Sequence, residues 1–301
     1  MEAAKHEPVP VIAVAPPPQF VAIEKSYDLS PYKDMDIVEG ENGIYALGKK
    51  LGSGAFGIVK RATNIKNKQT VAIKIIGIDD CNEREIQIMR VVKNLYCVSF
   101  IDCLETDESF YIVMEFCSQG DLFDAIEADI LDEPRVQKAA YDTLKGLQYL
   151  HRSGICHRDI KPENILHYVG VDEKNNLVDN WKVADFGIAT FFTEGKMIVG
   201  STGTTQYKAP EMFPPAKYTK AVDLWAVGIT IYVCLTGRFV WAGEADDEVL
   251  DSIQSYRIDY DNEFSSTAFS IILRLLDLNP ETRMTIEEAF SHQWLTRHHK
   301  Q

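Results

Sequence analysis

The sequence predicts an α+β protein of two lobes, in which a small antiparallel sheet with one helix precedes a larger, mainly helical lobe. The first observation is that short runs rich in β-branched and aromatic residues fill the chain from Gly43 to about residue 116. The second is a change after Gly120, beyond which long stretches carry apolar residues at helical spacing. Because strands precede helices instead of alternating with them, we expect an α+β arrangement.

Four runs in the first lobe have the alternation and the flanking turn residues that are typical of strands. They are YALGKKLG at 45–52, IVKRATNI at 58–65, TVAIKII at 70–76 and FYIVMEF at 110–116. Runs of this kind, separated by turn residues, predict a small antiparallel sheet.

One helix is expected between the third and fourth runs, over residues 80–94. A capping box of Asp80 and Glu83 is its predicted start, and Asn82 as the cap, with Glu85 at the third helical position, is the alternative. In the first case, Glu85 shares a helix face with apolar residues four and seven positions later, points toward the sheet and needs a cation. Only about three residues then remain between strand and helix, which leaves this connection little slack.

In the second lobe, the clearest helical pattern covers residues 133–151. Its apolar positions recur at helical spacing and comprise Val136, Ala140, Leu144 and Leu147.

The composition is that of an ordinary globular protein, with 46% apolar and 25% charged residues. The net charge of -14 argues against nucleic acid or an anionic membrane as the main partner, and it suits attraction of a basic protein segment. The six cysteines include no CxxC pair, which indicates reduced thiols in an intracellular protein, cytoplasmic or nuclear. No secretory or membrane-spanning segment is apparent.

Six of the twelve prolines lie in the first 31 residues. This bias predicts an extended or disordered, proline-rich tail over residues 1–42, and a docking site for a proline-binding partner is the alternative to a plain tail. Residues 297–301 are expected to form a second, short tail.

Two motifs carry the chemistry: CHRDIKPENIL at 156–166 and ADFG at 184–187. A match of this length, followed at a plausible distance by the second motif, has a negligible chance rate. The chain therefore resembles the eukaryotic protein kinases over residues 43–296, and within them the calmodulin-dependent and checkpoint-like kinases. The resemblance implies the bilobal kinase fold, with an N-lobe at 43–114, a hinge at 115–120 and a C-lobe at 121–296.

The resemblance also implies phosphoryl transfer from ATP with Mg²⁺. Asp159 is implied as the base that accepts the proton of the substrate hydroxyl, and Asn164 and Asp185 as the metal ligands. Lys161 is expected to neutralise charge on the transferring phosphoryl group. His157 is expected to be a packed scaffold residue without a chemical role.

The segment LGSGAFGIV fits the glycine-rich loop of kinases, in which missing side chains let backbone N–H groups approach phosphate oxygens. Lys74 of the VAIK sequence is expected to contact phosphates and to pair with Glu85, whereas an isolated lysine on a strand is usually only solvated. The adenine is expected to lie against the apolar side chains of Val59, Ala72 and Leu166. Met114 is the expected gatekeeper residue, and the backbone of Glu115 and Cys117 forms the hinge side of the site. Asp121 is expected to bind the ribose or a substrate arginine. The implied nucleotide site comprises Leu51, Gly52, Ser53, Gly54, Ala55, Phe56, Gly57, Val59, Ala72, Lys74, Met114, Glu115, Cys117, Asp121 and Leu166.

Two features of the sequence resemble the pattern of the serine/threonine kinases. They are Lys161 within HRDIKPEN and the segment GTTQYKAPE at 203–211. Thr204 is expected to bond near Asp159, and Arg283 to pair with Glu211. Arg158 is expected to bind a phosphate on the activation segment, the stretch from the DFG motif to the APE motif. The candidate acceptors on that segment are Ser201, Thr202 and Thr193.

The function expected from these residues is an ATP-dependent serine/threonine protein kinase. A pseudokinase scaffold, which binds partners through the same fold, is the alternative. Pseudokinases generally lack the lysine, the catalytic aspartate or the DFG aspartate, and all three residues are present here. Protein substrates are expected to be basic upstream of the acceptor, because Asp121 and Glu163 occupy positions where related kinases contact arginines.

Overall fold

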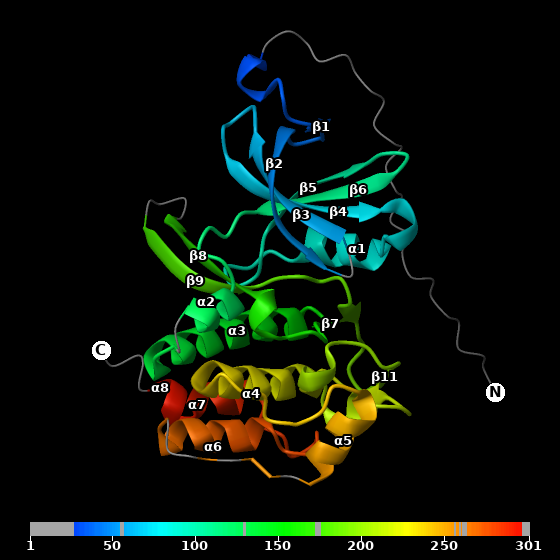
Figure 1. The fold of residues 1–301 in the computed structure, drawn as a ribbon. Helices are drawn as coiled ribbons and strands as arrows, with labels where there is room; N and C mark the ends of the chain where they lie inside the picture. Colours follow the sequence, from blue (N-terminus) through cyan, green and yellow to red (C-terminus); the bar gives the residue numbers. More distant parts are fainter. Residues whose placement is uncertain are drawn as a thin grey trace, which may run out of the picture.

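The computed structural model describes residues 27–54, 57–128, 131–171, 176–255, 257–258, 260 and 264–296. Two of the predicted nucleotide-site residues, Ala55 and Phe56, and most of the two predicted tails lie outside these ranges. The described part forms two lobes, with a sheet and one helix in the upper lobe and the long helices in the lower one (Figure 1). The predicted bilobal α+β fold is confirmed.

The upper lobe is built on a six-stranded antiparallel sheet with the strand order β1-β2-β3-β4-β6-β5. The strands are β1 (Ile37–Glu39), β2 (Ile44–Gly54), β3 (Gly57–Asn64), β4 (Thr70–Gly77), β5 (Phe100–Glu105) and β6 (Ser109–Glu115). The four predicted runs correspond to β2, β3, β4 and β6. The order brings β4, which carries Lys74, next to β6, which leads into the hinge.

Strand β1 lies within the region 1–42 that the sequence predicted to be a tail, so that prediction was wrong for its last residues. Ile37–Glu39 pairs with β2 at the sheet edge, and the buried Asp102 fixes the turn between the two strands. Its Oδ2 accepts hydrogen bonds from the backbone N–H of Asn42 at 2.8 Å and from Tyr45 Oη at 3.1 Å. A strand of three residues has too short a pattern to be recognised in a sequence.

Helix α1 (Glu83–Val91) begins three residues later than predicted. Asn82, and not Asp80, is the cap, and its Oδ1 accepts a hydrogen bond from the backbone N–H of Arg84. A short 3₁₀ helix (Ile78–Asp80) occupies the connection instead, so five residues rather than three separate β4 from α1. The predicted inward face is nevertheless present, because Glu85 is buried.

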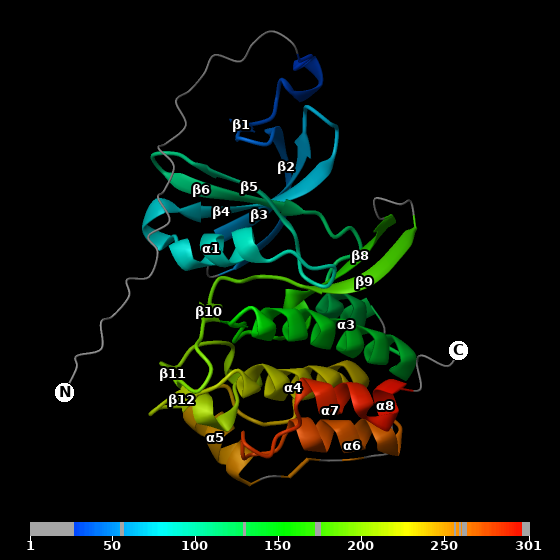
Figure 2. The same ribbon diagram turned by 180° about the vertical axis from the view of Figure 1, so that it is seen from behind.

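The lower lobe contains the remaining α-helices of the described residues. They are α2 (Leu122–Ala128), α3 (Glu133–Arg152), α4 (Ala221–Thr236), α5 (Asp246–Gln254), α6 (Ser266–Leu275), α7 (Ile286–Ser291) and α8 (Gln293–Thr296). Helix α4 is buried on all sides from Val222 onward, as expected of a helix that is apolar all round. Helix α3 lies between α4 and the upper lobe in both views (Figures 1 and 2).

Three short antiparallel pairs place the loops of the site. They are β8 (Ile165–Val171) with β9 (Leu177–Val183), β7 (Ile155–Cys156) with β10 (Thr190–Phe191), and β11 (Ile198–Val199) with β12 (Lys217–Tyr218). Because Ile165 pairs with Val183, the residues just before β8 and just after β9 are neighbours. The catalytic-loop and DFG motifs, about twenty residues apart in sequence, therefore meet at one end of this hairpin.

Among the described residues, none of the helices combines the length and the apolar character needed to cross a membrane.

Candidate active site

A cleft with a volume of about 1210 Å³ lies between the lobes. Every predicted site residue that the structure describes lines it, including the residues of the glycine-rich loop, the hinge, the catalytic loop and the DFG motif. The apolar side chains of Val59, Ala72, Met114 and Leu166 line the cleft, as expected for an adenine site. Charged and amide side chains line it as well, so the cleft combines an apolar part with a polar part suited to phosphates.

The three glycines of the glycine-rich loop have different reasons to be glycine. A Cβ at Gly57 would lie 2.1 Å from the Ile75 carbonyl oxygen, and its φ of +124° disfavours any side chain, so the fold itself requires glycine there. At Gly52 and Gly54 a Cβ would meet no described atom within 4 Å. Both line the cleft, so close approach of a ligand to the backbone is the remaining physical reason for glycine at these positions.

Lys74 joins two carboxylates at the centre of the cleft. Its Nζ lies 2.6 Å from Glu85 Oε1 and 3.0 Å from Asp185 Oδ1, so the predicted contact between Lys74 and Glu85 is present. Burial works against the charge on Lys74, but the two carboxylates outweigh it and raise the pKa of the ammonium group. Burial likewise opposes ionisation of Asp185, yet the charge of Lys74 lowers the pKa of that carboxyl. This arrangement holds a permanent cation where phosphates would lie.

Glu85 is more deeply buried than its partners, with a side-chain exposure of 3%. Burial raises the pKa of its carboxyl, and the charge of Lys74 and its hydrogen bond only limit that rise. The pair fixes the position of Lys74 and adds little to the stability of the fold, because a buried ion pair recovers little of its desolvation cost.

Asp159 is 8% exposed and is held by donors on both carboxylate oxygens. The backbone N–H and the hydroxyl of Thr204 donate to Oδ1 at 3.1 and 2.8 Å, and Asn164 Nδ2 donates to Oδ2 at 3.0 Å. Lys161 Nζ lies 3.2 Å from Oδ2 and donates to Thr204 Oγ1 at 2.8 Å. The expected contact of Thr204 with Asp159 is thus present, and the carboxylate has a fixed orientation.

Asn164 and Asp185 provide oxygen atoms of the kind that Mg²⁺ binds. The amide nitrogen of Asn164 is directed at Asp159, donating also to its backbone carbonyl at 2.8 Å, which leaves Asn164 Oδ1 as the oxygen for a metal ion. Asp185 Oδ1 is bound to Lys74 and to the backbone N–H of Gly187, while the side chain stays 36% exposed to the cleft. The donor set therefore fits the metal that the motifs imply.

His157 is fully buried and takes part in packing, as expected. Its Nε2 lies 2.9 Å from the Ala184 carbonyl oxygen and its ring meets Phe186 edge-on. The backbone N–H groups of His157 and Arg158 donate to the buried Asp223, at 3.0 and 2.8 Å. Burial opposes ionisation of Asp223, but the hydrogen bond and charge of His151, with smaller contributions from the His157 side chain and the Arg158 N–H, lower the pKa of its carboxyl. The loop that carries Asp159 is thereby fixed to helix α4.

Asp121 performs a role that the sequence did not suggest. Its Oδ1 accepts a hydrogen bond from the backbone N–H of Asp124 at 2.8 Å, so it caps α2. Burial raises the pKa of Asp121 to about 6. Asp121 also lines the cleft, so it lies where a ligand could contact it.

The segment from Asp185 to Glu211 is attached to the lower lobe by several contacts. Arg283 binds both carboxylate oxygens of Glu211, at 2.6 and 3.0 Å, so the predicted pair is present. Arg158 Nε donates to the Ile188 carbonyl oxygen at 2.7 Å, and Arg158 Nη1 donates to Tyr218 Oη at 3.2 Å. Tyr218 Oη in turn donates to the Gly200 carbonyl oxygen at 3.0 Å.

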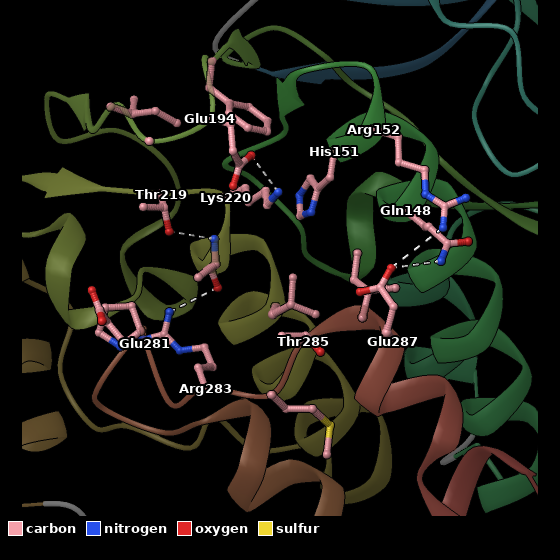
Figure 3. A pocket seen from close by; sticks show the side chains of 18 of the residues that line it. Gln148, His151, Arg152, Glu194, Thr219, Lys220, Glu281, Arg283, Thr285 and Glu287 are labelled. Atoms are coloured by element: carbon pink, nitrogen blue, oxygen red, sulfur yellow. Dashed lines mark hydrogen bonds and ion pairs between the residues drawn. The ribbon is translucent and has the colours of Figure 1, made fainter.

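A second cavity, of about 570 Å³, lies beneath the activation segment (Figure 3). Charged side chains at its border pair with one another, Lys220 with Glu194 at 2.9 Å and Arg152 with Glu287 at 3.8 Å. None of the predicted nucleotide-site or catalytic residues lines it. The cleft between the lobes, and not this cavity, is therefore the candidate active site.

Two functional contacts were not foreseen. The side chain of Glu115 binds Lys182 with both oxygens, at 2.8 and 2.7 Å, and so connects the hinge to β9 behind the cleft. The side chain of Asn82 reaches the Gly187 carbonyl oxygen at 2.9 Å. No sequence signal pointed to either, because each joins residues more than 60 positions apart and neither pair belongs to a motif for which the resemblance implies a partner.

The sequence of the chain is similar to those of known protein kinases. The sequence profile described as "Protein kinase domain" matches residues 45–295. A probable myosin light chain kinase of Dictyostelium discoideum is 32% identical over 85% of this chain and 67% of its own length. CBL-interacting serine/threonine-protein kinase 8 of Arabidopsis thaliana is 35% identical over 85% of this chain and 58% of its own length. The probable serine/threonine-protein kinase MARK-C of Dictyostelium discoideum is 34% identical over 84% of this chain. The chain spans only 33% of that relative.

Proposed function

The chain belongs to the eukaryotic serine/threonine protein kinases, and from this premise we propose that it transfers the γ-phosphate of ATP to serine and threonine hydroxyls of protein substrates. The observation that supports this proposal most strongly is the convergence of Lys74, Asp159 and Asp185 on one cleft. A pseudokinase scaffold remains the alternative. No observation favours it, since each residue that such proteins generally lack is present and in contact with a fitting partner.

Asp159 is proposed as the base. When the substrate hydroxyl attacks the γ-phosphorus and the bond to the β-phosphate oxygen breaks, the hydroxyl proton passes to the Asp159 carboxylate. The bonds from Thr204 and Asn164 keep that carboxylate in one orientation, so no rotamer search is needed at the moment of transfer. Lys161, 3.2 Å from Asp159 Oδ2, is close enough to neutralise charge on the moving phosphoryl group.

The remaining polar residues position the nucleotide. Lys74, oriented by Glu85, is proposed to contact the phosphates, and the backbone at Gly52 and Gly54 to cover them. Asn164 and Asp185 would hold Mg²⁺ through their oxygens. When bound, this ion neutralises negative charge on the phosphates.

Substrates are proposed to be proteins with basic residues upstream of the acceptor. Asp121, Asp124 and Glu163 line the same cleft as Asp159, so their negative charge lies beside the proposed path of the peptide. The net charge of -14 supports the same preference by attracting basic segments.

An intracellular location is proposed from the cysteines. All six are free thiols, and four of them are buried. A proline-binding partner for the first residues stays a prediction from composition.

The proposed function can be tested by incubating the purified protein with radiolabelled ATP, Mg²⁺ and a basic acceptor protein, followed by phosphoamino acid analysis. We expect label on serine and threonine. Label on neither residue, from folded protein that binds ATP, would favour the scaffold alternative.

A further inference from the structure

Asn82 links the start of α1 to the DFG motif, and we propose that it is a positioning residue for Asp185. Its Oδ1 accepts a hydrogen bond from Arg84 N at 3.2 Å, and its Nδ2 donates to the Gly187 carbonyl oxygen at 2.9 Å. One side chain thus caps the helix that carries Glu85 and holds the turn that carries Asp185. The inference rests on the proposed function, because it concerns a residue proposed to bind the metal.

The DFG turn is a place where the backbone needs support. Asp185 adopts a φ of +57°, a left-handed conformation that a residue with a side chain rarely occupies. Such a conformation persists only when surrounding contacts determine it. Gly187, two residues later, is bound through both backbone polar groups. Its N–H donates to Asp185 Oδ1 at 3.2 Å, and its carbonyl accepts from Asn82.

The next residue is held from the other lobe. The Ile188 carbonyl oxygen accepts a hydrogen bond from Arg158 Nε at 2.7 Å. Two successive carbonyl groups are therefore bound by side chains that come from different lobes, Asn82 from the upper one and Arg158 from the catalytic loop. Losing the Asn82 side chain would leave Lys74 as the upper-lobe side chain that holds this strained turn, through Asp185.

The residue type at position 82 matches this double role. A helix cap needs only an oxygen acceptor, which serine, threonine and aspartate supply as well as asparagine. The contact with Gly187 needs a hydrogen-bond donor at the same time, and among the good capping side chains only asparagine has its donor and its acceptor on separate atoms. Aspartate at this position would place a carboxylate against the carbonyl oxygen of Gly187.

The link also couples the two halves of the site. Lys74 already connects Glu85 of α1 with Asp185. Asn82 adds a second connection one turn earlier on the same helix, so α1 cannot move outward without releasing the DFG turn. The position of α1 and the orientation of Asp185 are thereby tied together.

The test uses two variants that keep the cap and share only the loss of the amide donor, Asn82→Asp and Asn82→Ser. We expect each to lower kcat about fivefold and to raise the Mg²⁺ concentration for half-maximal rate, as the loss of one hydrogen bond implies. The melting temperature should stay within a few degrees of wild type, because the cap remains. Asn67→Asp adds the same charge to an exposed turn whose acceptor bond to Gln69 N it preserves, and it should behave as wild type.

The outcomes separate this inference from the proposed function. An inactive wild-type protein would count against the proposed function itself. An active wild type with both Asn82 variants unchanged would overturn the positioning role. A loss confined to Asn82→Asp would assign the effect to charge, and a loss of rate without the shift in Mg²⁺ requirement would assign it to general stability. Either result would also overturn the inference.

Discussion

Single residues of this site differ in how much of their identity the fold explains. The glycine-rich loop is the clearest case, because Gly57 is required by its own backbone and by Ile75, whereas Gly52 and Gly54 face open cleft. The sequence motif has glycine at all three positions and does not distinguish these reasons. Their different surroundings show that only some of the glycines in the motif indicate a bound ligand.

At the residue scale, Asp185→Asn should weaken binding of the Mg²⁺–ATP complex by about tenfold or more, because it removes a charged metal ligand. Binding of ATP in the presence of EDTA should change much less. Titration calorimetry with and without Mg²⁺ distinguishes the two effects. Equal weakening under both conditions would mean that Asp185 acts on the fold and not on the metal.

Asp121 predicts a pH dependence of substrate choice. Its pKa, raised to about 6 by burial, means that the carboxylate is ionised at pH 7.5 and largely neutral at pH 5.5. If it binds a substrate arginine, the preference for an arginine peptide over its alanine analogue should fall as the pH is lowered through 6. In Asp121→Asn, which keeps a good helix cap, that preference should be weak at both pH values. A preference that is independent of pH in the wild type would exclude this role.

At the scale of elements, the connection into α1 shows where local sequence rules fail. The Asp80 and Glu83 pair has the spacing of a capping box, yet the alternative, Asn82, is the cap, and its amide gains a contact with Gly187 as well. That gain comes from a residue more than 100 positions away, which a local rule cannot weigh. The partner of Glu85 was nevertheless predicted, since an inward carboxylate on this face needs a cation.

The length of this connection gives a prediction. Inserting four Gly/Ser residues after Gly77 should let α1 move outward. The rate of phosphoryl transfer should then fall by roughly tenfold, because a smaller fraction of the molecules keeps Glu85 in contact with Lys74. The same insertion after Asn67, in the turn between β3 and β4, should have little effect. Steady-state rates for the two proteins compare the positions directly. Equal rates for both insertions would show that the connection does not restrain α1.

The activation segment gives a second prediction at this scale. Three N–H groups of Arg158 contact Ile188 and Tyr218, and a guanidinium has five. Tyr218 also binds Gly200, which places Arg158 close to Ser201 through one intervening side chain. We expect a phosphate on Ser201, or on Thr202 or Thr193, to raise activity by engaging the remaining donors. Mass spectrometry of fully active protein that found all three residues unmodified would refute this.

On the scale of the whole molecule, the sequence predicted the two lobes, the strands β2, β3, β4 and β6, helix α3 and most of the residues that line the cleft. These parts depend on hydrophobic periodicity and on motifs that are contiguous in the chain. What it could not predict are contacts between distant residues, such as Glu115 with Lys182 and Asn82 with Gly187, and the short edge strand β1. The contacts depend on how segments far apart in the chain come together, and β1 is too short to have a recognisable pattern.

The proposed phosphoryl transfer depends on Asp159 acting as the base in a cleft whose nucleotide site is otherwise complete. The most direct measurement is therefore to compare phosphoryl transfer and ATP binding in the wild type and in Asp159→Asn. We predict that the variant binds Mg²⁺–ATP nearly as tightly as the wild type and loses about 10² or more of the transfer rate, as removal of a general base implies. A variant that keeps more than about a tenth of the wild-type rate would contradict the assignment of Asp159 as the base.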